Sequence, residues 1–573
     1  MNGSTSLLEM RHISFTYPTK QQKSLEDISF SIKEGSFVVL CGQSGSGKST
    51  LLRHIKKNQI PFGEGEGECL YAGTLIQELS DYDNAIEIGY VGQNPESQLV
   101  TDRVWHELAF GLENIGMETE NIRRKVTETA EYFGMSSWFR KDVMKLSGGQ
   151  KQLLNLASVM AMEPRFLLLD EPTSQLDPIS ARRFIQTLVQ INQDFGTTIL
   201  LSEQRLEEVI PLADQILILH NGKLIFDGSS QNLPAKIEEF ERQTGEQLPI
   251  KEAMPAALRT YMEWQNQTTN PIKKEEKIPV SVRDGKIFLS RFYSKTDVLE
   301  GRKEKITDKR QNRGLLKSGV LKRKADGKQI VIKAKHLEYW YDKKTPLLRD
   351  VNLEIEQQQC HAILGGNGAG KTTLLKLLCG IYKAKAGKCQ VTGKIVCLPQ
   401  DPKALFAEVT VEEELLAMAP EVEQMLCWLG LADKKEQNPM DLSGGEQQRL
   451  ALGKILLTEP DIILLDEPTK GLDAAFKQKL AAMIEQLKEN GKTILMVSHD
   501  IEFCARNADW CTMLFDGEMH EMERIREFLS QNSYYTTAAH RMAMDFDREV
   551  ILWEEIYEQI KEQEADLLAS QIF

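Results

Sequence analysis

Short apolar runs, each bounded by glycine or charged residues, recur along the chain. Phe37 to Leu40 and Phe166 to Leu169 are such runs in the first half, and Ile494 to Val497 is one in the second half. Apolar runs of this length next to turn residues predict fully buried strands, as in a parallel sheet. A leucine-rich stretch after the first run predicts a helix, so the pattern indicates an α/β fold. All runs are far shorter than the about 18 apolar residues of a membrane-spanning helix.

A different pattern occurs near the end of the chain. Val550, Trp553, Ile556, Tyr557 and Ile560 are spaced mainly three to four residues apart, which predicts one apolar face of a helix. The polar face of this helix is acidic, whereas helices that lie on membranes carry a basic polar face. We therefore expect the apolar face to cover the flank of a domain.

The chain contains an internal repeat. CGQSGSGKSTLL at 41–52 recurs as LGGNGAGKTTLL at 364–375, KLSGGQKQ at 145–152 as DLSGGEQQ at 441–448, and FLLLDEPTSQLD at 166–177 as IILLDEPTKGLD at 462–473. Order and spacing agree, although the second copy is 27 residues shorter between its first two motifs. Such self-similarity indicates duplicated units. We predict like domains at 1–232 and 330–540, a linker at 233–329 and a helical tail at 541–573.

Charge is distributed unevenly over the 573 residues. The formal net charge is −14, with 70 Lys and Arg against 84 Asp and Glu, yet the segment from Pro271 to Ile330 carries about +10. The composition of this basic segment suggests a mostly solvated linker, with a short strand possible around Ile287 to Phe292. Overall acidity counts against a general nucleic-acid binder. Nine cysteines, an odd number without a CxxC pair, fit a reducing cytosol and argue against a disulfide framework or a zinc ribbon. The N-terminus is too polar for a secretory signal.

In each copy an apolar strand runs into GxxGxGK[ST]T and then into a helix, which is the context that a phosphate-binding loop requires. Its glycines would let backbone N–H groups face phosphate oxygens. Lys48 and Lys371 would reach the β and γ phosphates of ATP, and the Ser49 and Thr372 hydroxyls would bind Mg²⁺. A bare glycine turn before a helix is the alternative for a single match. The expected loop residues are Gly42, Gly45, Gly47, Lys48, Ser49 and Thr50, and Gly365, Gly368, Gly370, Lys371, Thr372 and Thr373.

A pair of carboxylates ends a second apolar strand in each copy. Asp170 and Asp466 would hold the metal beside the phosphate loop, and Glu171 and Glu467 would orient and deprotonate the attacking water. An Asp-Glu pair after a strand can also form a turn or cap a helix. The phosphate-loop motif in the same domain favours the catalytic interpretation.

Together these motifs resemble the nucleotide-binding subunits of ABC ATPases, here fused in tandem. The resemblance implies two P-loop ABC-type domains, each a RecA-like mixed sheet core with a helical subdomain. It also implies that the domains close head to tail, so that each phosphate loop is completed by the LSGG signature of the other domain. Site one would pair Lys48, Ser49, Asp170 and Glu171 with Ser443, Gly444 and Gly445; site two would pair Lys371, Thr372, Asp466 and Glu467 with Ser147, Gly148 and Gly149.

The same resemblance assigns two further pairs of residues. Gln93 and Gln400 look like the Q-loop glutamines that sense Mg²⁺ and water. Tyr17 and Tyr341, located 31 and 30 residues ahead of the loop lysines, look like the aromatic residues that stack on adenine. An aromatic side chain at that position can equally pack within a strand.

The two copies differ at one catalytic position. Aligning TTILLSEQRLEE with KTILMVSHDIEF places Gln204 opposite His499, where ABC ATPases carry the switch histidine. Glutamine can hydrogen-bond a phosphate but cannot carry a positive charge or titrate near neutrality. We therefore expect site two to turn over and site one to bind ATP and hydrolyse it slowly. The alternative is that glutamine substitutes for histidine, because Glu171 is retained.

The segment VGQNPESQLVTDRVWHELAFGLENIG at 91–116 resembles energy-coupling factor (ECF) importer ATPases, and SEQRLEEV resembles their SEHRLEEV. YYTTAAHRMA at 534–543 is similar to a segment of fused ATPases linked to uptake of thiamine precursors. This resemblance implies a peripheral subunit at the cytoplasmic face of the membrane that powers import of a vitamin, a vitamin precursor or a transition-metal ion. Its partners would be a transmembrane T-type subunit, whose coupling helix enters a groove near 93–110, and a small substrate-binding membrane subunit. The cargo cannot be read from this chain.

The second copy departs from this pattern, since LPQDPKALFAEVTVEEEL at 398–415 lacks the QNPxxQ form. Two rival functions remain. Soluble tandem ABC proteins also act on ribosomes, and a basic linker would suit RNA phosphates; however, Pro279 and several glycines would interrupt the long helices expected there. A tandem sugar-importer ATPase is the other. We favour the importer and expect no direct nucleic-acid binding.

Overall fold

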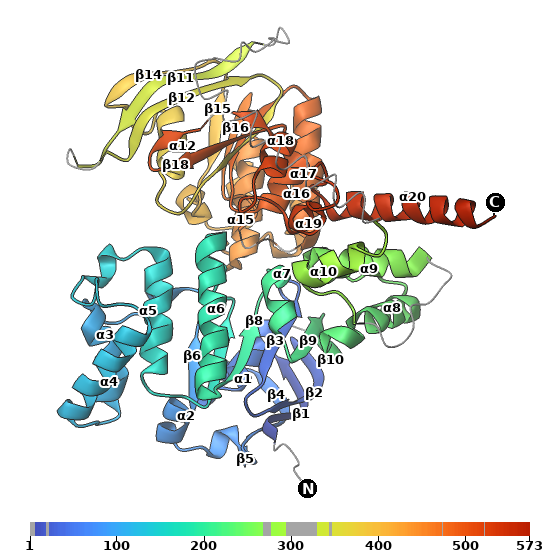
Figure 1. The fold of residues 1–573 in the computed structure, drawn as a ribbon. Helices are drawn as coiled ribbons and strands as arrows, with labels where there is room; N and C mark the ends of the chain where they lie inside the picture. Colours follow the sequence, from blue (N-terminus) through green and yellow to red (C-terminus); the bar gives the residue numbers. More distant parts are fainter. Residues whose placement is uncertain are drawn as a thin grey trace. The chain divides into compact units, whose positions relative to one another are not determined.

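The computed structural model describes residues 6–18, 22–267, 277–293, 329–342, 346–470, 472, 474–520 and 522–572. The chain divides into two compact units, one formed by Met1–Met262 with Asn270–Ser281 and the other by Glu263–Thr269 with Val282–Phe573. Each unit contains an antiparallel sheet, a mostly parallel sheet and a group of helices (Figure 1). The fold is thus a mixed α/β architecture that occurs twice, as the repeat predicted.

The central sheet of the first unit has the order β10-β9-β3-β8-β7-β6, with all pairs parallel except β9 and β10. Every residue of β3, β7 and β8 is buried, which explains why these strands read as continuous apolar runs. Because the strands are parallel, their carboxyl ends meet at one edge, where the motif residues lie. The strands are β3 (Phe37–Gly42), β6 (Ile88–Val91), β7 (Phe166–Asp170), β8 (Thr198–Ser202), β9 (Gln215–His220) and β10 (Lys223–Gly228).

An antiparallel sheet of order β2-β1-β4-β5 covers one face of this central sheet. Both sheets contribute to one apolar cluster, in which Leu8 and Ile28 of the antiparallel sheet join Leu40 and Leu168 of the central sheet. The strands are β1 (Ser6–Thr16), β2 (Leu25–Lys33), β4 (Glu64–Tyr71) and β5 (Thr74–Leu75).

Helices complete the first unit. Helices α3 and α4 pack beside α5, whose N-terminus carries the signature motif (Figure 1). The helices are α1 (Lys48–His54), α2 (Asp81–Glu87), α3 (Val104–Asn114), α4 (Thr119–Tyr132), α5 (Gly148–Met160), α6 (Pro178–Phe195), α7 (Leu206–Val209) and α8 (Leu233–Thr244), together with α9 (Ala256–Gln267) as far as Met262.

The second unit repeats the arrangement in shorter form. Its sheets have the orders β12-β11-β14 and β15-β16-β17-β13-β18-β19, with β20 paired to β18. The strands are β11 (Ile330–Tyr339), β12 (Leu348–Glu356), β13 (Cys360–Leu364), β14 (Ala386–Val391), β15 (Ile395–Leu398), β16 (Ile462–Asp466), β17 (Thr493–Val497), β18 (Trp510–Phe515), β19 (Glu518–Met519) and β20 (Glu523–Arg524).

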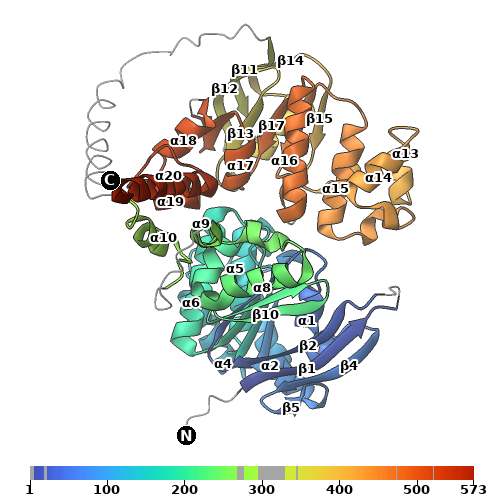
Figure 2. The same cartoon turned by 90° about the vertical axis from the view of Figure 1, so that its right-hand side faces the viewer.

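The shortened region between the first two motifs lies partly in the helices of this unit, where α13 and α14 lie beside α15 (Figure 2). Helix α14 has 7 residues, whereas α4 of the first unit has 14. The helices are α10 (Val282–Leu289), α12 (Lys371–Leu378), α13 (Val411–Leu416), α14 (Glu423–Leu429), α15 (Gly444–Leu456), α16 (Ala474–Glu489), α17 (Ile501–Asn507), α18 (Ile525–Gln531), α19 (Ala538–Ala543) and α20 (Trp553–Ile572).

In its described residues, the segment at 233–329 that we expected to be a linker contains the α-helices α8, α9 and α10, of which only α10 lies in the basic stretch. Leu233 and Ile237 of α8 are buried in the apolar cluster of the first unit, because leucine and isoleucine four residues apart share one helix face. Ile287 lies in α10, so the short strand that was possible around Ile287 to Phe292 is not formed. Most of the basic segment, namely residues 271–276 and 294–328, lies outside the described residues.

The tail is helical, as its spacing predicted, although α20 begins only at Trp553. Val550, Ile556, Tyr557 and Ile560 are buried. Ion pairs from Arg506 of α17 and Arg526 of α18 hold the first turn of α20 through Glu554 and Glu555. Among the described helices of the chain, none is long and apolar enough to cross a membrane.

Candidate functional site

The first phosphate loop connects β3 to α1. Gly47 precedes α1 with φ = +105°, and a Cβ atom there would lie 2.7 Å from the carbonyl oxygen of Ser24. Only glycine fits such a position. By contrast, a Cβ on Gly45 would meet no atom within 4 Å, so open space lies beside the loop. The loop therefore has the tight backbone and the adjacent free space that a phosphate group requires.

Lys48 places its ammonium group inside this loop. Its Nζ donates to the carbonyl oxygens of Gly42 and Gln43 at 2.9 and 3.0 Å, and it lies 3.4 Å from Oε1 of Glu171. The side chain is buried. The cation thus lies between the loop and the carboxylate that follows β7, where it can neutralise phosphate charge.

The carboxylate of Asp170 lies at the end of β7, next to the phosphate loop. Its Oδ1 accepts hydrogen bonds from the hydroxyls of Ser49 at 3.1 Å and Ser202 at 2.8 Å. The side chain of Tyr90 lies near this carboxylate. Sequence reasoning found Asp170 and Ser49 but missed Ser202 and Tyr90, which come from the neighbouring strands β8 and β6.

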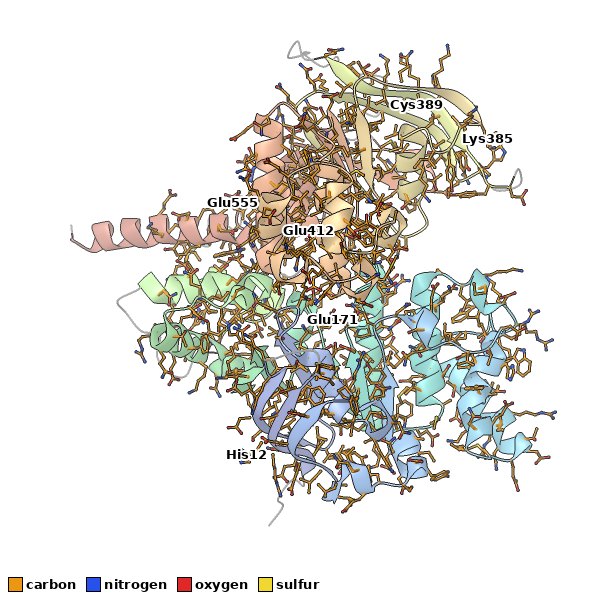
Figure 3. All side chains as sticks on the ribbon, turned by 180° about the vertical axis from the view of Figure 1, so that it is seen from behind. His12, Glu171, Lys385, Cys389, Glu412 and Glu555 are labelled. Atoms are coloured by element: carbon orange, nitrogen blue, oxygen red, sulfur yellow. The ribbon has the colours of Figure 1, made fainter. Side chains whose placement is uncertain are left out.

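Glu171 lies in a left-handed backbone conformation, with φ = +44°, which is uncommon for a residue other than glycine and tends to occur at functional sites. Its carboxylate accepts from Nε2 of Gln93 at 3.2 Å and from Nε2 of Gln204 at 2.9 and 3.0 Å. Figure 3 labels Glu171 among the side chains. The structure therefore brings together Lys48, Gln93, Glu171 and Gln204, all expected from the sequence.

A buried carboxyl group next to this cluster was not expected. Glu203 is 2% exposed and accepts from both the backbone N–H and the hydroxyl of Thr173, at 3.1 and 2.6 Å. Burial raises the pKa of Glu203 to about 7. Glu203 therefore connects the loop that carries Gln204 to the turn that follows Glu171. In the aligned second copy this position is Ser498. The glutamate between Ser202 and Gln204 was therefore the signal that the sequence offered.

The second phosphate loop, between β13 and α12, repeats the first. Lys371 Nζ donates to the carbonyl oxygens of Gly365 and Gly366 at 2.8 and 3.0 Å. Gly370 has φ = +102° and, like Gly368, a left-handed backbone.

His499 reaches this loop, unlike its counterpart Gln204. Its Nε2 lies 3.2 Å from Lys371 Nζ, 3.0 Å from Asn367 Oδ1 and 3.3 Å from Glu467 Oε1. Its backbone N–H donates to Oε2 of Glu467 at 3.0 Å. The imidazole thus contacts both the phosphate loop and the second catalytic candidate, so the two sites differ in geometry as well as in residue type.

Asp466 ends β16, near the side chain of Thr372. Its Oδ1 is buried without a hydrogen-bond partner among the described residues, and burial raises the pKa of this carboxyl. Val497 occupies the position of Ser202 and offers no hydroxyl. Gln400 is exposed, and no hydrogen bond joins it to Glu467 in the way that Gln93 is joined to Glu171. A buried, unpaired carboxylate oxygen next to a threonine hydroxyl fits a magnesium ion, because this hard cation prefers oxygen ligands.

The hydroxyls of the two candidate adenine-binding tyrosines are hydrogen-bonded to threonines in the first turns of α1 and α12. The Tyr17 hydroxyl lies 3.1 Å from Oγ1 of Thr50, and that of Tyr341 lies 3.2 Å from Oγ1 of Thr373. Tyr341 is 66% exposed. Both hydroxyls therefore lie close to the phosphate loop, and the exposed ring of Tyr341 makes edge contacts with Tyr339 and Tyr382.

The signature serines begin helices. Ser147 caps α5 and Ser443 caps α15, each in a reciprocal capping box with the residue at position 150 or 446. Ser147 and Ser443 are exposed, as are Gly148 and Gly444, whereas Gly149 and Gly445 are partly exposed. Helix N-termini with accessible N–H groups favour anions.

A buried glutamate in each unit was also missed. Glu107 of α3 accepts from the N–H groups of Val100 and Thr101 and from the Thr101 hydroxyl. Glu414 of α13 accepts in the same way from Ala407 and Glu408. Each carboxylate therefore fixes the loop between the Q-loop glutamine and the next helix. A glutamate on the otherwise apolar face of each helix was the sequence signal for this contact.

Comparison with known proteins agrees with this geometry. The sequence profile described as ABC transporter matches residues 25–174 and 348–470. An ABC transporter ATP-binding protein from Bacillus thuringiensis subsp. konkukian is 39% identical, with 96% of this chain and 98% of the relative covered. One from Clostridium tetani is 31% identical, over 75% of this chain and 93% of the relative.

Among solved structures, an archaeal ribosome recycling factor, aABCE1, in complex with the ribosomal stalk protein aP1, has a TM-score of 0.56 at 21% identity, over 91% of each chain. At this identity the likeness concerns the fold alone. The full-length match to relatives, the twofold profile match and the two phosphate-loop sites lead to one conclusion: the chain is a tandem ATPase that belongs to the family of ABC transporter ATP-binding proteins.

Proposed function

We propose that this chain is the ATP-hydrolysing subunit of an ECF-type membrane importer of a vitamin, a vitamin precursor or a transition-metal ion. It would lie at the cytoplasmic face of the membrane and bind a transmembrane T-type subunit, which works with a small substrate-binding membrane subunit. The observation that carries the proposal is an apolar surface on the first unit, which we call the α3 surface and define as Val100, Trp105 and Met144.

The α3 surface is exposed although it is apolar. Val100 is 66% exposed, Trp105 44% and Met144 79%. The backbone N–H of Trp105 donates to Phe139 O and that of Val143 to Asp102 O, so the two segments lie side by side. Large apolar side chains that gather on a surface mark an interaction site. This surface lies in the region that resembles the coupling groove of ECF ATPases.

Glu107 gives the α3 surface a fixed shape. Its buried carboxylate holds the backbone of Val100 and Thr101 through hydrogen bonds of 3.1 and 2.7 Å. A preformed surface loses little conformational entropy on binding. These features suit contact with a helix of a membrane protein that presents apolar side chains to the α3 surface.

The proposed reaction is ATP hydrolysis at two composite sites, each completed by the signature of the other unit. Ser49, Gln93 and Asp170, and Thr372, Gln400 and Asp466, are the candidate residues for Mg²⁺, which would neutralise charge on the β and γ phosphates. Lys48 and Lys371 would bind the phosphates, and the signature N–H groups would bind the γ-phosphate. Glu171 and Glu467 would orient the attacking water.

We propose that site two is the more active of the two. His499 contacts the loop asparagine and lysine, so it can bind the γ-phosphate while Glu467 positions water. In site one the amides of Gln204 and Gln93 occupy the Glu171 carboxylate. A carboxylate that already accepts these hydrogen bonds is a weaker base toward water.

Affinity purification of the full chain from solubilised membranes tests the importer role. We expect two small hydrophobic partners with wild-type protein, their loss with Trp105→Ala, and their retention with Phe62→Ala, a control at a side chain that is 89% exposed on another part of the first unit. Association with ribosomes that is sensitive to salt, without membrane partners, would support the ribosome-acting alternative instead. A larger, sugar-transporting membrane partner would point to the third candidate.

A further inference from the structure

In the first unit, the segment that follows β8 holds the segment that follows β7. We call residues 203–205 the switch segment and residues 171–176 the β7 turn. Glu203 of the switch segment accepts hydrogen bonds from the backbone N–H of Thr173 at 3.1 Å and from its hydroxyl at 2.6 Å. Both residues are 2% exposed. The carboxyl group therefore depends on these two donors, because burial keeps water from replacing them.

The next two residues of the switch segment extend this contact along the β7 turn. Gln204 Nε2 donates to both carboxylate oxygens of Glu171, at 2.9 and 3.0 Å. Arg205 Nη1 donates to the carbonyl oxygen of Leu176 at 3.2 Å. Three neighbouring side chains therefore bind the beginning, the middle and the end of the β7 turn. A reactive side chain keeps one geometry when hydrogen bonds of this kind hold the loop that carries it.

The aligned segment of the second unit, from Ser498 to Asp500, makes different contacts. The Ser498 hydroxyl accepts from the backbone N–H of Asp500 at 3.0 Å, within the same segment. The Asp500 carboxylate accepts from the N–H of Phe503 at 3.0 Å and from Lys477 of α16 at 2.7 Å. An ionised aspartate, unlike arginine, has no proton to donate to a carbonyl oxygen. Glutamate and arginine thus flank the switch residue in the first unit, and serine and aspartate flank it in the second.

We propose that Glu203 and Arg205 are positioning residues of site one, which hold Gln204 against Glu171 and so keep this carboxylate a weak base toward water. The effect passes through Gln204, because its amide donates to the oxygens that would otherwise take a proton from the attacking water. A carboxylate that accepts hydrogen bonds in its charged form binds a proton less readily. The inference rests on the proposed slow hydrolysis of ATP at site one, and it adds the residues that set the rate there.

Thr173→Val is the mildest change that weakens this contact. Valine has nearly the shape of threonine but lacks the hydroxyl that donates to Glu203, whereas the backbone N–H of residue 173 remains. The variant should loosen the switch segment, weaken the hydrogen bonds on Glu171 and raise hydrolysis at site one about two- to fivefold. Thr173→Ser keeps a hydroxyl and should hydrolyse ATP at the parent rate. Arg205→Ala removes the donor to the other end of the β7 turn and should also raise the rate.

The test measures phosphate release by the full chain that carries Glu467→Gln, in which site one accounts for the remaining hydrolysis. In this parent chain, Thr173→Val should raise kcat and change KM less than about twofold, because the phosphate loop itself is unaltered. Arg182→Ala is the matched control. Arg182 of α6 is an exposed arginine that pairs with Glu208 at 2.9 Å, so its replacement should leave the rate of the parent chain unchanged.

A double-mutant cycle separates positioning from a general loosening of the unit. When Gln204 is already alanine, no amide remains to be positioned, so adding Thr173→Val should change the rate less than about 1.5-fold. A general loosening would instead produce the same change with either residue at position 204.

Each of four results would overturn the proposal: Thr173→Val or Arg205→Ala no faster than the parent chain, Thr173→Ser as fast as Thr173→Val, Arg182→Ala as fast as Arg205→Ala, or an undiminished effect of Thr173→Val beside Gln204→Ala. All rates are measured on purified chain without a membrane partner, so failure of the importer role leaves this test unaffected. Single replacements of the two catalytic candidates test the unequal sites independently.

Discussion

The side-chain amide of Gln204 donates to both carboxylate oxygens of Glu171, at 2.9 and 3.0 Å. In the second unit, His499 instead lies 3.0 Å from Asn367 of the phosphate loop and 3.3 Å from Glu467. The residue at the switch position therefore restrains the carboxylate in one unit and extends to the phosphate loop in the other. This difference leads to unequal roles for the two glutamates.

We predict that Glu467→Gln lowers ATP hydrolysis by the full chain at least about tenfold, whereas Glu171→Gln lowers it less than about twofold. The reason is that Glu467 is the candidate base of the faster site. Steady-state phosphate release by each purified variant is the measurement. Equal losses in the two variants would contradict the unequal sites.

Gln204→His should increase hydrolysis at site one. Histidine can contact the γ-phosphate and titrates near neutrality. Its introduction also removes the two hydrogen bonds that the Gln204 amide donates to Glu171. The measurement is phosphate release in a Glu467→Gln background, where we expect an increase of about three- to tenfold. Gln204→Ala is the control: it also frees Glu171 but supplies no imidazole, so an equal gain would show that histidine is not the cause.

Glu203 should make the first unit less stable as pH rises. Its pKa is about 7 in the folded protein because of burial, above its ordinary value, so the folded state holds the proton more tightly than the unfolded state. The stabilisation from this proton is present at low pH and is lost as pH rises through about 7. It amounts to at most roughly 3.5 kcal/mol, at about 1.4 kcal/mol per pKa unit.

Thermal unfolding between pH 5.5 and 8 measures this effect. The midpoint of wild-type protein should fall more over this range than that of Glu203→Gln, which cannot ionise. Glu128→Gln changes an exposed glutamate of the same unit and should keep the wild-type slope. Identical slopes for Glu203→Gln and wild type would count against the buried carboxyl as the source.

Glu107→Ala should destabilise the first unit by about 2–3 kcal/mol, because three donors from two residues lose a buried, charged acceptor. Glu113→Ala, on the same helix but exposed, should cost less than about 0.5 kcal/mol. Denaturant titration followed by tryptophan fluorescence is the measurement. Similar costs for the two variants would mean that the hydrogen bonds to Val100 and Thr101 contribute little.

Local sequence patterns predicted much of the sheet core. The apolar runs at Phe37 and Phe166 are strands because buried parallel strands need apolar residues on both faces. The phosphate loops were also recognisable, since the loop conformation depends on glycines close together in the sequence. The helices at 233–293 were missed because a short apolar face among charged residues becomes informative only when a neighbouring surface covers it.

The sequence by itself determined that the protein has two ATP-binding domains, because each phosphate loop and each Asp-Glu pair is a local motif. Only the tertiary structure decided which side chains act on them. Ser202 reaches Asp170 from the neighbouring strand, and Glu203 reaches the turn after Glu171 from the loop that follows that strand. Such contacts depend on how strands are ordered and how helices pack on them, and sequence spacing does not encode either.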